Sequence, residues 1–158
     1  MAQTKPTTYC FVEGKEPLYL DHYRAEGEGA HPCVLFAFGG GFSHGNRADS
    51  RYMPYFEMLL SEGFDVVSID YRLGMKFTLD LNKELGPLKS AKAMYLAVNN
   101  AAEDVLRATD FIHRQAVKMN IDISRIVVSG SSAGAIAVLQ AEKHIVNRNR
   151  RAKILAAD

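Results

Sequence analysis

Residues 125–134 read RIVVSGSSAG, an apolar run that leads into a serine flanked by glycines. The β-branched residues Val127 and Val128 predict a buried strand, and the helix formers without proline from Ala133 to Val146 predict a helix behind it. Ser132 would then lie on a sharp turn at the carboxyl end of the strand, with a helix N-terminus behind its hydroxyl. In this context the pattern Gly-x-Ser-x-Gly makes Ser132 a candidate nucleophile.

A second motif lies upstream, where residues 33–38 read CVLFAF and residues 39–42 read GGGF. The apolar run predicts another buried strand, and the three glycines leave backbone N–H groups free to converge on one point. Together with the N–H of Ala133, these groups can hold the negative oxygen that forms when a serine attacks an ester carbonyl. Either motif alone is equally well read as a tight glycine turn. The two together favour the catalytic interpretation.

With these two motifs, the chain resembles the amino-terminal half of an α/β-hydrolase of the esterase/lipase type. The nearest branches are the hormone-sensitive-lipase-like one and the bacterial carboxylesterase or feruloyl-esterase one. The resemblance extends from about Cys33 to Ala141, and its matching residues are 38–42, Asp70-Tyr71-Arg72-Leu73, Asp104 and 130–134.

The resemblance implies that Gly40, Gly41 and Ala133 are the oxyanion donors. One departure is visible, because the family usually has His before the glycines and this chain has Phe38. That His mainly supports the loop, so the departure concerns the geometry of the loop rather than the chemistry. Phe42, His44 and Ser131, which lie in or next to the two motifs, are candidate substrate contacts.

The rest of the chain predicts helices that alternate with apolar strands. Thr7 to Val12 and Leu18 to Tyr23 predict an antiparallel hairpin. Further strands are expected at 33–38, 64–69 and 125–129, helices at 52–60, about 90–119 and 133–146, and an irregular segment at 73–87. Such an alternation favours a mostly parallel sheet with helices on both faces. We therefore expect an α/β-hydrolase fold whose C-terminal part is absent, with residues 1–158 as the N-terminal portion of a single domain.

The composition of the chain argues against several classes of binding partner. The formal net charge of +1 creates no overall field for nucleic acid or an acidic membrane, and no apolar run approaches the length of a membrane span. The five histidines lack ligand spacing and the two cysteines are distant, so we expect no metal, no cofactor and two buried thiols rather than a disulfide. The first eight residues lack a signal-peptide core. The compartment stays open: cytoplasmic, or secreted or periplasmic if a leader was removed.

A serine nucleophile needs a base, and in this fold the order is Ser, then an acid, then His. After Ser132 the only histidine is His144, twelve residues along the expected helix. At a rise of about 1.5 Å per residue it lies roughly 18 Å away, and Glu142 fails for the same reason. His44 is expected near substrate, not as a replacement base. We therefore expect the acid and base beyond residue 158, and an inactive 158-residue chain.

An incomplete sheet would leave the strand that ends at Ser129 with an unpaired edge and an uncovered apolar face. We expect that edge to be filled by the missing C-terminal half or by another chain. The charged residues Asp70, Arg72 and Asp104 have two interpretations. In one of them, one of the two carboxylates belongs to the catalytic triad of serine, acid and histidine. In the favoured one Asp70 and Arg72 form an ion-paired turn and Asp104 bonds a neighbouring loop.

The leading functional hypothesis is a serine hydrolase that cleaves carboxylic esters through an acyl-enzyme on Ser132. The family resemblance implies short acyl or aryl esters, including acetyl or feruloyl groups on plant polysaccharides. Two alternatives remain. One is a catalytically incomplete fragment or pseudoenzyme that acts as a binding module, and the other is an acyltransferase or peptidase of the same fold.

Overall fold

The structure, a computed structural model, describes the backbone of residues 5–76 and 78–155 and the side chains of residues 5–76 and 86–147. Its elements are β1 (Thr7–Val12), β2 (Leu18–Tyr23), β3 (His31–Ala37), a 3-10 turn (Ser50–Tyr52), α1 (Met53–Ser61), β4 (Asp65–Ile69), α2 (Thr78–Met119), β5 (Ile121–Gly130) and α3 (Ala133–Leu155). The predicted hairpin is confirmed with both strands at their expected bounds, and each expected apolar strand is present.

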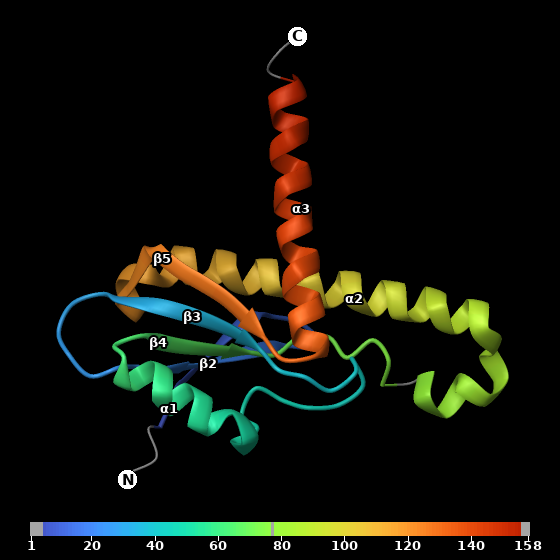
Figure 1. Cartoon of the computed structure of the whole chain (residues 1–158), viewed down its shortest axis with the longest axis horizontal. Coiled ribbons are helices and arrows are strands. Elements are labelled where there is room, and N and C mark those ends of the chain that lie inside the picture. The colour runs from blue at the N-terminus through green and yellow to red at the C-terminus, as the bar shows by residue number, and fades with distance from the viewer. Residues whose placement is uncertain (1–4, 77, 156–158) are drawn as a thin grey trace.

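The strands form one mixed sheet in the order β1-β2-β4-β3-β5 (Figure 1). β3 pairs in parallel with β4 and with β5, whereas β2 is antiparallel to both β1 and β4. Ala37 is in register with Ile69 on one side and with Gly130 on the other. The carboxyl ends of the three parallel strands therefore meet at one edge, where the two glycine motifs follow β3 and β5.

Helices lie on both faces of this sheet, as expected for an α/β fold. Figure 1 shows α1 on one face and α2 on the other. Apolar side chains of the helices and strands form these contacts. Phe56 of α1 and Ala101 and Ile112 of α2 are fully buried, as are Leu35 of β3 and Val67 of β4. Both faces of the central strands are covered, which explains why residues 33–37 of β3 read as a continuous apolar run.

The long helix α2 differs more from the sequence prediction than any other element does. It was expected from about Ser90, after an irregular segment, but α2 begins at Thr78 and is interrupted at Gly86, which has φ 66°. Pro87 follows the interruption, where its fixed φ and missing N–H suit the first turn of a renewed helix. Asn120 ends α2 with φ 56°, as expected of a residue that caps a helix.

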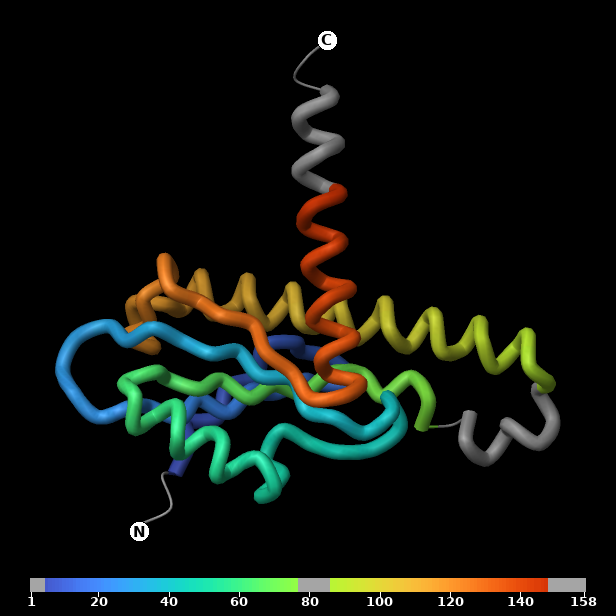
Figure 2. Tube along the Cα trace, viewed as in Figure 1, coloured from blue at the N-terminus to red at the C-terminus, as the bar shows by residue number. Residues whose placement is uncertain are grey.

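The trace in Figure 2 shows α3 leaving the sheet steeply beyond β5, while α1 and α2 run along it. Both cysteines are free thiols, but only Cys33 is buried as expected, whereas Cys10 is half-buried. Of the helices in the described ranges, none combines the length and hydropathy that a bilayer crossing requires.

Candidate active site

Ser132 occupies the turn between β5 and α3, and its backbone has φ 50°, a left-handed conformation that side chains rarely adopt. The residue is exposed. The helix starts directly behind it, because the N–H of Gly134 donates to the Ser131 carbonyl at 2.9 Å and the N–H of Ile136 donates to the Ser132 carbonyl at 3.1 Å. This strained turn holds the hydroxyl at the N-terminal end of α3, where the helix dipole favours negative charge.

The two glycines around Ser132 are required by close backbone packing. A Cβ at Gly130 would lie 2.5 Å from the carbonyl carbon of Gly134, and one at Gly134 would overlap with the carbonyl oxygen of Ala37. A side chain at either position would therefore collide with a flanking element. These contacts press the first turn of α3 against the end of β3.

The glycine loop follows β3 and lies beside Ser132. A Cβ built at Gly39 would be 3.2 Å from the Ser132 Cβ. The loop turns sharply, since the Gly40 carbonyl accepts the N–H groups of Ser43 at 3.0 Å and His44 at 3.1 Å. Among the described residues, the N–H groups of Gly40 and Gly41 have no acceptor. Two free main-chain donors thus lie in the loop that adjoins the candidate nucleophile.

Two tyrosines hold the start of this loop. The Tyr71 hydroxyl donates to the Phe38 carbonyl at 2.6 Å, its ring stacks on Phe38 at 4.4 Å, and burial raises its pKa so that it stays a donor. The Tyr52 hydroxyl accepts the N–H of Gly39 at 2.9 Å. Sequence reasoning missed Tyr52. The signal for it was Phe38 itself, which cannot supply the hydrogen bonds of the usual His.

The three candidate substrate contacts have different surroundings. Phe42 is buried, and its ring meets Tyr71 edge-on with centroids 6.1 Å apart, so its side chain belongs to the core. His44 is exposed, with Nδ1 2.9 Å from the Ser43 hydroxyl. Ser131 is half-buried and donates its N–H to Ala37 at 3.0 Å. Of the three, His44 is the side chain that is open to solvent near the loop.

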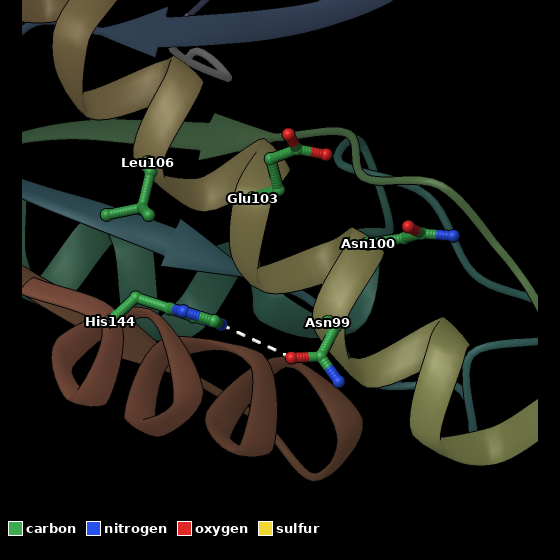
Figure 3. Close-up of a pocket in the computed structure, with 5 residues that line it drawn as sticks. All are labelled: Asn99, Asn100, Glu103, Leu106 and His144. Atoms are coloured by element: carbon green, nitrogen blue, oxygen red, sulfur yellow. Dashed lines mark hydrogen bonds between the residues drawn. The ribbon is translucent and has the colours of Figure 1, made fainter. Parts of the chain in front are cut away.

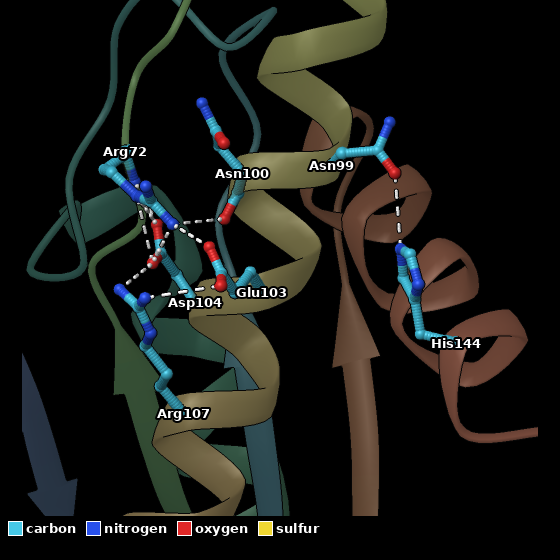
Figure 4. Close-up of polar contacts among 7 residues, drawn as sticks. All are labelled: Arg72, Asn99, Asn100, Glu103, Asp104, Arg107 and His144. Carbon is cyan, nitrogen blue, oxygen red and sulfur yellow. Dashed lines mark hydrogen bonds and ion pairs between the residues drawn. The ribbon is translucent and has the colours of Figure 1, made fainter. Parts of the chain in front are cut away.

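Asp104 of α2 is fully buried and holds the loop that follows β4 (Figure 4). The Arg72 guanidinium donates to both of its oxygens, with Nε at 2.9 Å from Oδ2 and Nη2 at 2.9 Å from Oδ1. The backbone N–H of Arg72 adds a third bond at 2.9 Å. Hydrogen bonds from Arg72 to Asp104 are the main reason that the pKa of Arg72 lies above its ordinary value. This geometry fits the structural interpretation of Asp104.

Asp70 has a different partner from the one expected. It accepts a hydrogen bond from Arg47 at 2.7 Å and one from the Tyr19 N–H at 3.2 Å, whereas Arg72 turns to Asp104. Burial raises the pKa of Asp70, although Arg47 opposes this shift. The turn after β4 is therefore held by two separate ion pairs, Asp70 with Arg47 and Arg72 with Asp104.

His144 faces α2 (Figure 3). Its Nε2 lies 3.2 Å from Oδ1 of Asn99, which also accepts from Gln140 at 3.0 Å. His144 lines a cavity of about 230 Å³ with Glu103 and Leu106 of α2. The imidazole is thus engaged between the two helices.

Two other histidines converge on Asp65, at the amino end of β4 and so at the sheet end opposite Ser132. His22 Nε2 lies 2.6 Å and His31 Nδ1 lies 2.8 Å from the fully buried carboxylate. Burial raises the pKa of Asp65, but the bonds from His22, the Ala25 N–H and His31 outweigh it, and the net shift is downward. This cluster was not found from sequence, because its members lie far apart along the chain.

This arrangement of sheet, serine turn and glycine loop defines the fold of an α/β-hydrolase. A family model described as BD-FAE matches residues 20–81. The native esterase Est2 from the planctomycete Thermogutta terrifontis has a TM-score of 0.63 at 22% identity, over 86% of this chain and 44% of that one. The chain has the α/β-hydrolase fold over the part that it shares with this esterase.

Two curated relatives are also esterases. Fumonisin B1 esterase of Sphingopyxis macrogoltabida is 30% identical over 126 residues, which are 77% of this chain and 22% of that protein. Juvenile hormone esterase of Tribolium castaneum is 28% identical over 127 residues, which are 78% of this chain and 20% of that protein. The chain therefore spans about a fifth of the length of these relatives.

Proposed function

We propose that this chain provides the nucleophile and the oxyanion donors of a serine hydrolase that cleaves carboxylic esters. The observation that carries the proposal is the exposed Ser132, held at φ 50° between β5 and α3 with the glycine loop beside it. The esterase names of the relatives support the same chemistry. Structures of the similar Est2 with propionate and with butyrate bound favour short acyl groups as the first substrates to test.

In this mechanism the Ser132 hydroxyl oxygen attacks the acyl carbon while a base removes its proton. The carbonyl oxygen becomes negative and accepts hydrogen bonds from the N–H groups of Gly40, Gly41 and Ala133. The alcohol leaves with a proton, and water then releases the acid from the acyl-enzyme. The free N–H groups of Gly40 and Gly41 suit this role because no described residue competes for them.

The base and its acid are proposed to come from polypeptide that covers the β5 edge. Among the described histidines, His22 and His31 bond Asp65 and His144 bonds Asn99. His44 is the one that lies in the glycine loop. β5 is the last strand of the sheet, and Ile123, Val127 and Val128 on it are exposed. A groove of about 280 Å³ between α2, β5 and α3 continues this apolar surface. We propose as its occupant a strand from further polypeptide, because the chain covers only 44% of the similar esterase Est2.

Labelling with a fluorophosphonate probe tests the proposal in the complete protein. We expect one covalent adduct, located at Ser132 by peptide mass spectrometry, and no adduct in Ser132→Ala. Ser61→Ala, which changes an exposed serine at the end of α1, is the control and should still be labelled. A folded protein that takes no label at Ser132 would instead support the second candidate, a binding module without turnover, which the absence of a placed base in the described structure favours.

A further inference from the structure

The peptide unit between Phe38 and Gly39 is held on both of its polar edges. Its carbonyl accepts the Tyr71 hydroxyl at 2.6 Å, and its N–H donates to the Tyr52 hydroxyl at 2.9 Å. A planar peptide bonded at both edges cannot rotate about the chain axis without breaking one of the bonds. Two tyrosines from different parts of the chain therefore fix the orientation with which the glycine loop starts.

Tyr52 is the member of this pair that lies next to the candidate nucleophile. A Cβ built at Gly39 would be 3.2 Å from the Tyr52 hydroxyl oxygen and 3.2 Å from the Ser132 Cβ, so the two side chains flank the same point. The Tyr52 ring is itself fixed, because it meets Phe36 edge-on at 4.8 Å and stacks with Phe56 at 6.4 Å. The hydroxyl therefore has one defined position beside the serine.

We propose that Tyr52 is a positioning residue for the oxyanion loop, a role that rests on the proposed serine-hydrolase function. Glycines rotate freely, so the directions of the Gly40 and Gly41 N–H groups depend on how the preceding peptide is held. Phe38 has no hydrogen-bonding group with which to hold it. The Tyr52 hydroxyl does so instead, and it aims the two N–H groups at the carbonyl oxygen of an ester bound at Ser132.

The first test measures the loop itself and needs no activity. In hydrogen exchange of this chain, the Gly39 amide should be protected relative to the unbonded Gly41 amide, and Tyr52→Phe should make it exchange at least about 10-fold faster. Tyr55→Phe is the matched control: Tyr55 also packs on Phe36, at 5.8 Å, and its hydroxyl lies 3.3 Å from that of Ser129. Equal exchange at Gly39 and Gly41 in the wild type would overturn the proposal even if the variant failed to fold.

The second test measures the chemistry in the complete protein. Tyr52→Phe should lower the maximal rate of fluorophosphonate addition at Ser132 by about 10- to 100-fold, with the probe's dissociation constant within about twofold, because a misplacement of about 1 Å at a reacting site can cost about 100-fold. Tyr55→Phe should stay within about twofold of wild type. A labelled wild type with an equally fast Tyr52→Phe variant would overturn the positioning role alone. A wild type without label would overturn the proposed function and the positioning role together.

Discussion

Gly134 lies directly against the carbonyl oxygen of Ala37, so that a methyl group at Gly134 would overlap with that atom. The contact joins the first turn of α3 to the last residue of β3. It is the packing relationship that brings the Ser132 turn and the glycine loop together, although the two motifs lie about ninety residues apart in the sequence.

Gly134→Ala is therefore expected to destabilise the fold, although alanine is the better helix former. The added methyl group meets backbone on a neighbouring strand, which cannot rotate away, and overpacking of this kind costs about 3 kcal/mol. Helix propensity alone would give a gain of about 1 kcal/mol. The midpoint of urea unfolding distinguishes the two. Ala135→Gly in the same turn is the control, with an expected loss of about 1 kcal/mol. A stabilised Gly134→Ala variant would contradict the packing argument.

Removal of the buried carboxylate in Asp104→Ala should lower the free energy of unfolding by about 2 kcal/mol, because Arg72 loses its bidentate partner. The loss is smaller than for a fully buried pair, since the Arg72 side chain is 32% exposed. Glu103→Ala removes the exposed partner of the same guanidinium and should cost less than about 1 kcal/mol.

The same pair of variants separates the two interpretations of Asp104. If Asp104 is structural, the rate of Ser132 labelling per folded molecule stays at the wild-type level in Asp104→Ala of the complete protein. A loss of labelling with intact thermal unfolding would make Asp104 part of the catalytic machinery.

The sequence predicted the strands, the serine turn and the glycine loop because each is written in a short contiguous pattern. Local chemistry determines them: β-branched runs form strands, and glycines allow the close approach of Gly134 to Ala37. The start of α2 was not predicted. Gly86 and Pro87 are typical of a loop, but the helix continues on both sides of the break at Gly86.

The polar contacts that hold the site could not be predicted in the same way. Tyr52 bonds Gly39 across 13 residues, and Asp104 bonds Arg72 across 32. Such pairs depend on how elements pack, since either residue has many possible partners of the same chemistry. The expected Asp70–Arg72 pair shows this, because both residues do form ion pairs but with Arg47 and Asp104 instead.

The thiol of Cys33 should be unreactive in the folded chain, whereas that of Cys10 reacts. Burial, followed by the charge of Asp65, raises the pKa of Cys33 to about 12, so hardly any thiolate exists at pH 8. A chromogenic disulfide reagent should titrate one thiol per native chain and two in denaturant. Rapid reaction of both native thiols would show that this part of the core is open.

The same shift predicts a pH dependence of stability. The unfolded thiol loses its proton near pH 9, whereas the native one keeps it up to about pH 12. Between these values the native state binds more protons, so stability falls as pH rises. The urea midpoint should decrease from pH 9 to pH 11, and the slope should be shallower in Cys33→Ala than in wild type, whatever the absolute stability of that variant.

The β5 edge leads to a prediction for the 158-residue chain on its own. Val127 is 53% exposed on the last strand of the sheet, and an apolar strand without a neighbour pairs readily with other chains. We expect concentration-dependent association in sedimentation velocity at tens of micromolar, and a clear reduction in Val127→Lys, because a charge at an edge strand opposes pairing. Val117→Lys is the control, since Val117 is more exposed but lies on α2 rather than on the edge strand itself. Association that is equally strong in wild type and in both variants would place the contact elsewhere on the molecule, and a monomeric wild type would show that the edge does not need a covering segment.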